Sequence, residues 1–580
     1  MHAPAASRVT TAIVCALLLA VSALLSAASV LTKSPTYDEP MHAVSGWMQS
    51  RLGIYGLASD QPPLWSEWEA LPNGPDALRL DAARYASATD REVMVTDALF
   101  RTEGVDGDAV IQRSRWMMLP LTMCLGTLLA IWAWTLGGTS AAIIATAFFS
   151  FDPGFLGHGI LVKNDAGAAL FAFALAWFTW KVGQRVTWGT ALGLVLAFGL
   201  GVNVKFSIFL FAPVVAALLL ARALVGTEWI AFGRALSKPA SRLAIAAALC
   251  AAVGVGTWGV TWASYGCRYA PAPNREALLP MEELAQRTVG VQTLLAAHPG
   301  QVPSSADLAS WSPTSSVRAL IALDRAQLMP YAWTSGILTL LARATAPQSY
   351  LLGETSVHGH WYYFPLVFVV KLPTATVIAA LLLLLARPRL GWNLAVVGAF
   401  PVAYLVYSMA SNLNIGVRHL LPVLPFLYLG LGVAAAQSRR AAVLTGALAV
   451  FAMAETLHAT PDFVAFFNLP AGGAKGGLRI LGDSNLDWGQ DLPALADWAE
   501  KHADKKLYLS YFGLAEPAAY GVKYEALLPH DSLPAHALVA VSASHLQGIG
   551  DALEPTTLKR LRDLPPTAVL GGTIYVYDLP

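Results

Sequence analysis

Two adjacent carboxylates, Asp38 and Glu39, follow the first apolar run of the chain, in the stretch "SPTYDEPMHAVSGW" at residues 34–47. Proline disfavours helix at the residue before it and suits the first helical position, so we expect a helix that starts at Pro40, with Glu39 at its cap and Asp38 just outside. The positive end of that helix would keep both carboxylates ionised. One could then act as a general base towards a hydroxyl group, and the other could contact a metal ion, a backbone group or a second substrate group. His42 is a further candidate substrate contact. The alternative is that the acidic pair only caps a helix.

Charged side chains also stand beside three later apolar runs. In "HGILVKNDAGAALF", Asp165 directly precedes such a run and Lys163 lies two residues earlier. Asp165 could cap the helix or act on a substrate. Lys205 follows in "GVNVKFS", and Arg418 and His419 follow in "NIGVRHLLPVLPF". A single basic residue at such a place usually reaches to lipid headgroups. Several of them on one membrane face with an acid cluster could instead bind a lipid-linked phosphate, because arginine makes forked contacts with oxyanions.

Two other stretches have competing interpretations. Lys371, in "YYFPLVFVVKLP", is expected about two helical turns into an apolar span, where a charge is either functional or reaches to the surface. The stretch "GDSNLDWGQDLPALADW" resembles a calcium-binding loop. It has Trp488 where the EF-hand needs glycine and Ala494 at the twelfth position, so that pattern fails. We expect a turn that leads into a helix near Pro493.

The composition places these residues in a membrane protein. Of 580 residues, 56% are hydrophobic and 13% are charged, whereas a soluble globular chain carries about 25% charged residues. The formal net charge of +1 gives no sign of affinity for nucleic acid. The four cysteines suggest neither a disulfide framework nor a metal site. We therefore predict an α-helical polytopic membrane protein.

About eleven apolar runs approach the 20 residues that a transmembrane helix needs. The first is Val9–Leu31, whose apolar core is too long for a signal peptide. The other ten windows are 115–137, 138–157, 165–180, 187–203, 206–222, 243–262, 362–385, 391–409, 417–436 and 441–458.

Basic residues in the short loops indicate one orientation. With a cytoplasmic N-terminus, every short basic loop obeys the positive-inside rule; these loops hold Lys181/Arg185, the connection from Arg222 to Arg242, Arg387/Arg389 and Arg439/Arg440. Residues 33–114, residues 263–361 and the tail from about residue 459 then lie on the external face. The acidic pair is therefore predicted to be external.

The external segments carry predictions of their own. In "LASDQPPLWSEWEALP" we expect a second interfacial helix, with Trp65 and Trp68 at headgroup depth. The run "MPYAWTSGILTLLARA" is too short to span and is expected along the interface or as a re-entrant segment. Residues 459–580 are expected to form a small α/β domain. Its strands would lie in "KLYLSYFG", "ALVAVSAS" and "TIYVYDL", and its helix in "LPALADWAEKHA".

Six stretches follow one another along the chain: "PTYDEPMHAVSGW", "DQPPLWSEWEALP", "KNDAG", "HWYYFPLVFVVKLP", "NIGVRHLLPVLPF" and "FFNLPAGG" with "LGDSNLDWGQDL". Together they resemble bacterial relatives of the protein O-mannosyltransferases and aminoarabinose transferases, which are lipid-phosphate-dependent glycosyltransferases of the GT-C superfamily. The resemblance runs from about residue 34 to the C-terminus. It implies a GT-C-like catalytic module over residues 1–458 and a periplasmic or lumenal domain over residues 459–580.

The resemblance also implies a reaction. A sugar, mannose-like or related, would pass with inversion from a polyprenyl-phosphate donor to an acceptor hydroxyl, with Asp38 as the base, Glu39 beside it and Asp165 as a second acidic motif. Relatives often carry an acid and then a basic residue before the "PPL" of the first loop, and in the aminoarabinose enzymes that acid is similar to a metal ligand. Here these positions are Asp60 and Gln61, which leaves a divalent cation possible but unassigned. The substrate-binding residues expected are His42, Asp60, Lys163, Lys205, Arg418 and His419.

The main alternative is a transporter or lipid flippase, and a scaffold whose tail binds a partner in cell-wall assembly is a third possibility. A transporter is expected to show repeated halves and charges near the membrane midplane, and here most charges lie in external loops. A nucleotide-sugar donor would need a glycine-rich phosphate loop, and the chain shows none. The acceptor stays open between a protein, a lipid and a glycan. The alanine-rich composition favours a bacterial inner membrane with a periplasmic active site, with an ER lumen as the alternative.

Overall fold

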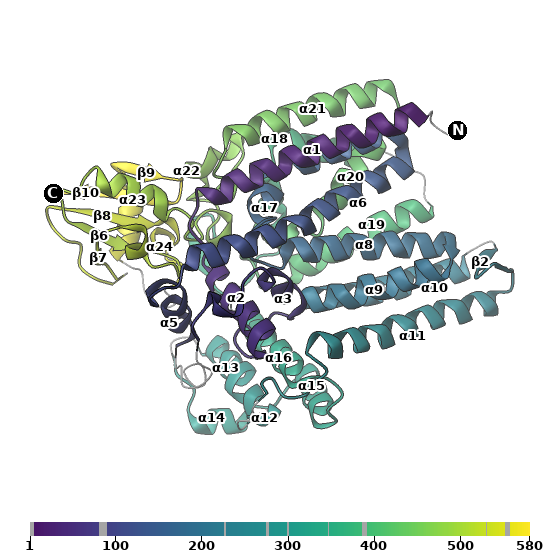
Figure 1. The fold of residues 1–580 in the computed structure, drawn as a ribbon, viewed down its shortest axis with the longest axis horizontal. Coiled ribbons are helices and arrows are strands. Elements are labelled where there is room, and N and C mark those ends of the chain that lie inside the picture. Colours follow the sequence, from purple (N-terminus) through teal and green to yellow (C-terminus); the bar gives the residue numbers. More distant parts are fainter. Residues whose placement is uncertain are drawn as a thin grey trace.

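Long helices side by side make up most of the computed structural model (Figure 1). The structure describes residues 5–80, 90–225, 228–273, 278–298, 301–345, 347–385, 391–528, 530–550 and 557–580. The bundle helices are α1 (Ala5–Leu31), α6 (Gly107–Ser150), α8 (Asp165–Gln184), α9 (Trp188–Val204), α10 (Phe211–Leu224), α11 (Pro239–Ser264), α17 (Tyr363–Lys371), α18 (Thr374–Leu384), α19 (Trp392–Ala410), α20 (Leu424–Ala435) and α21 (Arg439–His458).

Seven helices in the described ranges are long and apolar enough to cross a membrane, and α9, α18 and α20 are shorter apolar helices. The chain is therefore an integral membrane protein, while the count of eleven spans stays a prediction. Two expected windows differ in detail. The windows 115–137 and 138–157 meet inside α6, where Gly138 has φ 71° and ψ −155°, a conformation that glycine adopts without a Cβ clash. The window 362–385 is divided into α17 and α18 at Pro373, because proline lacks the N–H that would continue a helix.

Short helices gather at one end of the bundle. They are α2 (Asp38–Trp47), α3 (Leu64–Ala70), α5 (Arg91–Thr96), α7 (Pro153–His158), α12 (Met281–Ala285), α13 (Val291–Ala297), α14 (Ser305–Ser310), α15 (Ser315–Arg325) and α16 (Tyr331–Thr345). Helix α2 begins at Asp38 rather than at Pro40, since the first helical turn tolerates proline at any of its positions. Trp65 is buried rather than at headgroup depth, because α3 turns its ring towards His42 of α2, whereas Trp68 is exposed.

A five-stranded sheet lies beyond the same end of the bundle (Figure 1). Its strands are β6 (Leu507–Ser510), β7 (Glu525–Ala526), β8 (Ala537–Ser542), β9 (Ala568–Leu570) and β10 (Ile574–Leu579), in the order β7-β6-β8-β10-β9. Strand β6 pairs with β8 in parallel, and β8 pairs with β10 antiparallel. The three strand segments expected in the tail are strands, and α23 (Leu492–Glu500) begins one residue before the expected Pro493. That residues 459–580 form a domain of their own stays a prediction.

The two ends of the bundle carry different segments, as the threading of the chain requires. The N-terminus and β2 (Trp229–Ala231), from the connection between α10 and α11, lie at one end; α2, α3, α5, α16 and the sheet lie at the other (Figure 1). Arg387 and Arg389, which belong to the same predicted topology, lie outside the described residues. Which end faces the outside of the cell stays a prediction.

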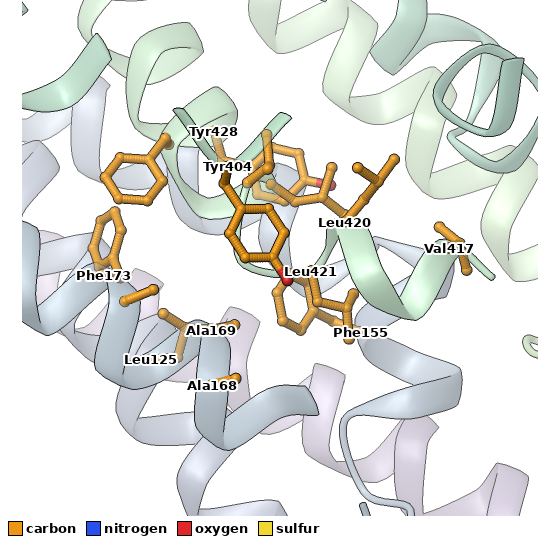
Figure 2. Close-up of a cluster of buried hydrophobic side chains, with 14 of the residues drawn as sticks. Leu125, Phe155, Ala168, Ala169, Phe173, Tyr404, Val417, Leu420, Leu421 and Tyr428 are labelled. Atoms are coloured by element: carbon orange, nitrogen blue, oxygen red, sulfur yellow. The ribbon is translucent and has the colours of Figure 1, made fainter. Parts of the chain in front are cut away.

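A buried apolar cluster joins the helices behind the short helical turn η6 (Val417–Leu420). Figure 2 shows aromatic and aliphatic side chains from α6, α7, α8, α19 and α20 around Leu420 and Leu421, with Val417 to one side. Small residues let these helices approach closely: a Cβ added at Gly432 of α20 would lie 2.4 Å from the carbonyl oxygen of Ala141 in α6. The cluster therefore fixes η6, which carries two predicted site residues, against the bundle.

Candidate active site

A cavity of about 1000 Å³ opens where α2, the start of α8, η4 (Phe206–Leu210), α16, the end of α19 and η6 meet. Eight of the nine residues predicted for the site lie on its wall, although they come from five separate parts of the sequence. They are Asp38, His42, Asp60, Lys163, Asp165, Lys205, Arg418 and His419. The ninth, Glu39, is not among the lining residues.

Asp38 lies between two cations. Its Oδ2 accepts hydrogen bonds from the ammonium group of Lys163 and, at 3.1 Å, from Nη1 of Arg418. The Asp38 side chain is 28% exposed, whereas both cationic side chains are 8% exposed. Burial alone would raise the pKa of the Asp38 carboxyl, but Lys163 and Arg418 outweigh it and hold that pKa well below its usual value. Asp38 is therefore ionised and faces the cavity.

His42 lies one turn after Asp38 on α2 and faces the same cation. Its Nε2 is 3.3 Å from Nζ of Lys163. Burial, and then the charge of Lys163, lower the pKa of His42 to about 3, so the ring is neutral at physiological pH. Burial and the neighbouring Arg418 also lower the pKa of Lys163. The cations around Asp38 thus repel one another, and a bound anion would relieve that repulsion.

A second ion pair lies on the same cavity wall. Asp165 is the first residue of α8, and its Oδ1 accepts from the ammonium group of Lys205, at the junction of α9 and η4. Asp165 is 2% exposed, and within the described part of the chain no donor reaches its Oδ2. The position before it, Asn164, makes no side-chain cap. Asp165 is thus paired with Lys205, and its role, as a helix cap or towards a substrate, stays a prediction.

Glu39 points away from the cavity into the protein. It is fully buried, and Arg115 of α6 binds it in a forked manner, with Nε–Oε1 at 2.8 Å and Nη2–Oε2 at 2.6 Å. The backbone N–H groups of Val162 and Thr36 also donate to it, at 3.0 and 2.8 Å. Arg115 additionally donates to three backbone carbonyls, those of Val30, Lys33 and Ser34. The Glu39–Arg115 pair therefore ties together the segment before Asp38 and the residue before Lys163.

The buried pair leads to a stability prediction. Glu39→Gln is expected to lower the free energy of unfolding by about 3 kcal/mol, because it leaves Arg115 as an uncompensated buried charge. The measurement is a denaturant titration of the purified protein in detergent. The matched control is Glu103→Gln at an exposed position, which should change the unfolding free energy by less than about 0.5 kcal/mol. Equal stability of the two variants would contradict the assignment.

Asp60, the candidate metal ligand, is paired with an arginine instead. Its Oδ2 accepts from Nη1 of Arg343 on α16, at 2.6 Å, and from the amide of Gln61, at 3.2 Å. The Gln61 oxygen accepts in turn from the Asn164 amide, at 2.6 Å. Over the ranges that the structure describes, no three His, Cys, Asp or Glu side chains group closely enough to hold a metal ion. Asp60 is thus paired with a guanidinium group, on an Arg343 side chain that is 66% exposed.

Trp488, from the stretch that resembles a failed calcium loop, lies behind both cations. Its ring centre is 4.4 Å from Cζ of Arg418 and 5.4 Å from Nζ of Lys163. Sequence reasoning missed Trp488, Arg115 and Arg343. Of these three, only Arg115 could have been found from the sequence. It stands at the edge of an apolar run, and an arginine buried at such a place needs an acidic partner.

The rest of the cavity wall is apolar. The lining side chains there are Phe206, Phe209, Leu210, Leu340, Leu341, Phe364, Tyr404, Tyr407, Leu413 and Ile415. Phe209 and Tyr407 are 36% and 49% exposed, so this wall continues onto the outer surface of the helices. The cavity thus joins a charged region around Asp38 to an apolar region that reaches the surface of the bundle.

No protein-family model matches the sequence, and no curated protein matches it. Among solved structures, ArnT from Cupriavidus metallidurans is similar in its apo state and bound to undecaprenyl phosphate, with 13% and 12% identity, a TM-score of 0.30 in each case and 97% of both chains covered. An apo oligosaccharyltransferase from Archaeoglobus fulgidus has 12% identity and a TM-score of 0.41, and the match covers 87% of this chain and 65% of that one. Likenesses at this level do not establish an activity.

Proposed function

We propose that the protein transfers a sugar, with inversion, from a polyprenyl-phosphate donor to an acceptor hydroxyl group. The observation that carries this proposal is the position of Asp38: an ionised carboxylate faces a large cavity and is flanked by two cations that a phosphate group could share. The apolar wall that continues to the surface of the helices suits the lipid chain of such a donor.

In the proposed reaction, the acceptor hydroxyl oxygen attacks the anomeric carbon of the sugar. A bond forms between that oxygen and the carbon, and the bond from the carbon to the phosphate oxygen breaks on the opposite side. Asp38 takes the hydroxyl proton, and the electron pair leaves with the lipid phosphate. Arg418, Lys163 and Lys205 would stabilise the charge of the leaving phosphate, as preorganised cations do in a site with little water.

Donor binding would also activate the base. In the free protein, Lys163 and Arg418 hold the pKa of Asp38 low, which makes it a weak proton acceptor. A phosphate group that takes over part of their charge would raise that pKa towards the value at which a base works well. The base would therefore become effective only when the donor is in place.

The other predicted residues receive proposed roles from their contacts. Asp165 holds Lys205 in place, and His42, which is neutral, provides a hydrogen-bonding group beside Lys163. Glu39 supports the site through Arg115 and does not touch the substrate.

The finer features of the prediction are kept as part of this proposal. The sugar is mannose-like or related, the acceptor is a protein, lipid or glycan, and the reaction takes place on the external, periplasmic face of a bacterial inner membrane. Residues 1–458 form the catalytic module and residues 459–580 a periplasmic domain.

A transfer assay tests the proposal. The purified protein in nanodiscs is incubated with a panel of polyprenyl-phosphate sugars that carry a radiolabel on the sugar, and loss of label from the lipid fraction is followed. Time-dependent loss with at least one donor, slower by about 10²–10⁴-fold in Asp38→Asn, is the expected result. Label that stays on every donor, while the protein is folded, would refute the transferase proposal and favour a transporter or scaffold.

The Asp60–Arg343 pair adds a prediction about metal dependence. Because the Asp60 carboxylate is neutralised by a guanidinium group, incubation with EDTA followed by desalting is expected to change the rate of transfer by less than about twofold, within the range of one weak interaction. The measurement is kcat/KM before and after chelation. A loss that added Mg²⁺, Mn²⁺ or Zn²⁺ restores would contradict the role given to Arg343.

A further inference from the structure

A loop of the tail, residues 483–488, contacts the reaction centre from behind. Trp488 is 2% exposed, and its ring lies under the guanidinium of Arg418 and near the ammonium of Lys163. The backbone carbonyl of Trp488 accepts from the N–H of Tyr37, at 2.7 Å, directly before Asp38. One residue thus lies beside both cations and bonds to the residue before the helix that carries the base.

The same loop holds the backbone around Arg418. The N–H of Val417 donates to Oδ1 of Asn485, at 2.9 Å, and Oγ of Ser484 donates to the carbonyl of Ile415, at 2.7 Å. A Cβ at Gly416 would lie 2.2 Å from Oγ of Ser484, so this approach depends on glycine. The loop therefore contacts each of the three residues before Arg418, which are Ile415, Gly416 and Val417.

Lys371 anchors the loop to the bundle. It is 3% exposed at the end of α17, and its ammonium group donates to the backbone carbonyls of Asn485, at 2.6 Å, Val464, at 3.0 Å, and Phe466. Three carbonyls satisfy all three N–H donors of the ammonium group. The sequence left two interpretations of Lys371 open, a functional group or a lysine that reaches to the membrane surface. In the structure its ammonium group is buried and bonds to the backbone of the loop.

We propose that the tail loop 483–488 is a working part of the reaction centre, in which Trp488 is a positioning residue for Arg418 and Lys163. Two cations beside one carboxylate repel each other, and an aromatic face attracts both without consuming a hydrogen-bond donor. The ring therefore keeps Arg418 and Lys163 together with their donors directed at the cavity, where an anionic group of the donor would bind. This inference rests on the proposed function.

The alternative is that Trp488 only fills space in a core. A filler and a positioning residue differ in what their loss changes. Loss of a filler lowers stability and leaves the folded fraction normally active. Loss of a positioning residue leaves the folded protein with weaker phosphate binding and with a base whose neighbouring charges have moved.

The test compares Trp488→Phe and Trp488→Leu with a matched control, Trp498→Leu. Trp498 is a half-buried tryptophan of α23 in the same tail. It stacks on His502, just after that helix, at 3.9 Å between ring centres, and it is not part of the cavity wall. Two quantities are measured on folded protein isolated by size exclusion: the Kd for undecaprenyl phosphate, used as the probe, and kcat/KM for the sugar donor. Thermal unfolding in the same detergent reports the folded fraction.

Trp488→Leu is expected to weaken binding of undecaprenyl phosphate and to lower kcat/KM by about tenfold or more, mainly through the donor KM, with a smaller loss in Trp488→Phe, whose ring attracts cations less strongly. Trp498→Leu should stay within about twofold of the wild type. If Trp488→Leu does not fold, the smaller loss of binding and of kcat/KM expected in Trp488→Phe tests the inference. Wild-type binding by folded Trp488 variants would overturn the inference.

The two proposals can fail separately. If the wild type binds undecaprenyl phosphate but transfers no sugar from any donor, the proposed function fails, while the binding constants still test the loop. If the wild type transfers sugar and the folded Trp488 variants match it in Kd and kcat/KM, only the inference about the loop fails. If the wild type does not bind undecaprenyl phosphate, both fail.

Discussion

Asp38→Asn is expected to lower the rate of sugar transfer by about 10²–10⁴-fold, the usual contribution of a general base. Asparagine keeps the shape of the side chain and can still accept a hydrogen bond from Lys163 or Arg418, but it cannot take the hydroxyl proton. Since Asp38 is 28% exposed at the cavity wall, the variant should remain folded. The measurement is kcat/KM for the labelled donor, together with the unfolding midpoint in detergent.

The neighbouring residue, Glu39, provides a matched control for the Asp38 variant. Asp38 and Glu39 are neighbours in the first turn of α2, yet one faces the cavity and the other binds Arg115 in the interior. Asp38→Asn should therefore lose activity and keep its fold, and Glu39→Gln should lose stability while its folded fraction keeps transferring sugar. A folded Asp38→Asn protein with wild-type kcat/KM would remove Asp38 from the role of base.

The sequence predicted which charged side chains lie close together better than how they pair, for a physical reason. Charged residues are costly next to lipid, so those that stand beside apolar runs are few, and a single threading of the chain brings Asp38, Asp165, Lys205 and Arg418 to the same end of the bundle. All four line the same cavity, and their roles stay predictions. Which charged side chains pair with one another was not predictable from the sequence. Asp60, for example, pairs with Arg343, which is about 280 residues away in the chain.

Asp38 and Glu39 point in different directions, and the sequence could not predict which of them faces the cavity. Adjacent helical residues point in different directions, so two roles could be expected, but the direction of each depends on the tilt of α2 against α6. Arg115 decides it: the forked bond to Glu39 fixes the rotation of α2 and turns Asp38 outward. Trp488 was missed for a similar reason, since its loop looked like a defective calcium site, and its contacts with Arg418 exist only in the folded chain.

Arg418→Met is expected to lower kcat/KM by about 10²–10³-fold, the loss typical of removing one donor that stabilises developing negative charge. Arg418 is the cation best suited to the leaving phosphate, because it offers a planar fork of donors and lies beside the base. Arg418→Lys keeps the charge and loses the fork, so it should fall between the wild type and Arg418→Met. The control is Arg479→Met, an exposed arginine of the tail paired with Asp563 at 3.0 Å, which should leave transfer unchanged.

The pH profile of Arg418→Met shows whether its activity is lost because a positive charge beside Asp38 is removed or because the protein is misfolded. The acid limb of kcat/KM reports the pKa of the base in the free enzyme. In the wild type that pKa lies well below its usual value, because Lys163 and Arg418 favour the charged carboxylate over the neutral acid despite burial. Removing one of these positive charges favours the neutral acid, so the pKa of Asp38 rises and the acid limb moves to higher pH. Arg418→Lys should leave the limb near its wild-type position. A limb that stays in place in Arg418→Met would mean that Asp38 is not the group that titrates, and would remove the electrostatic link between the phosphate-binding cations and the base.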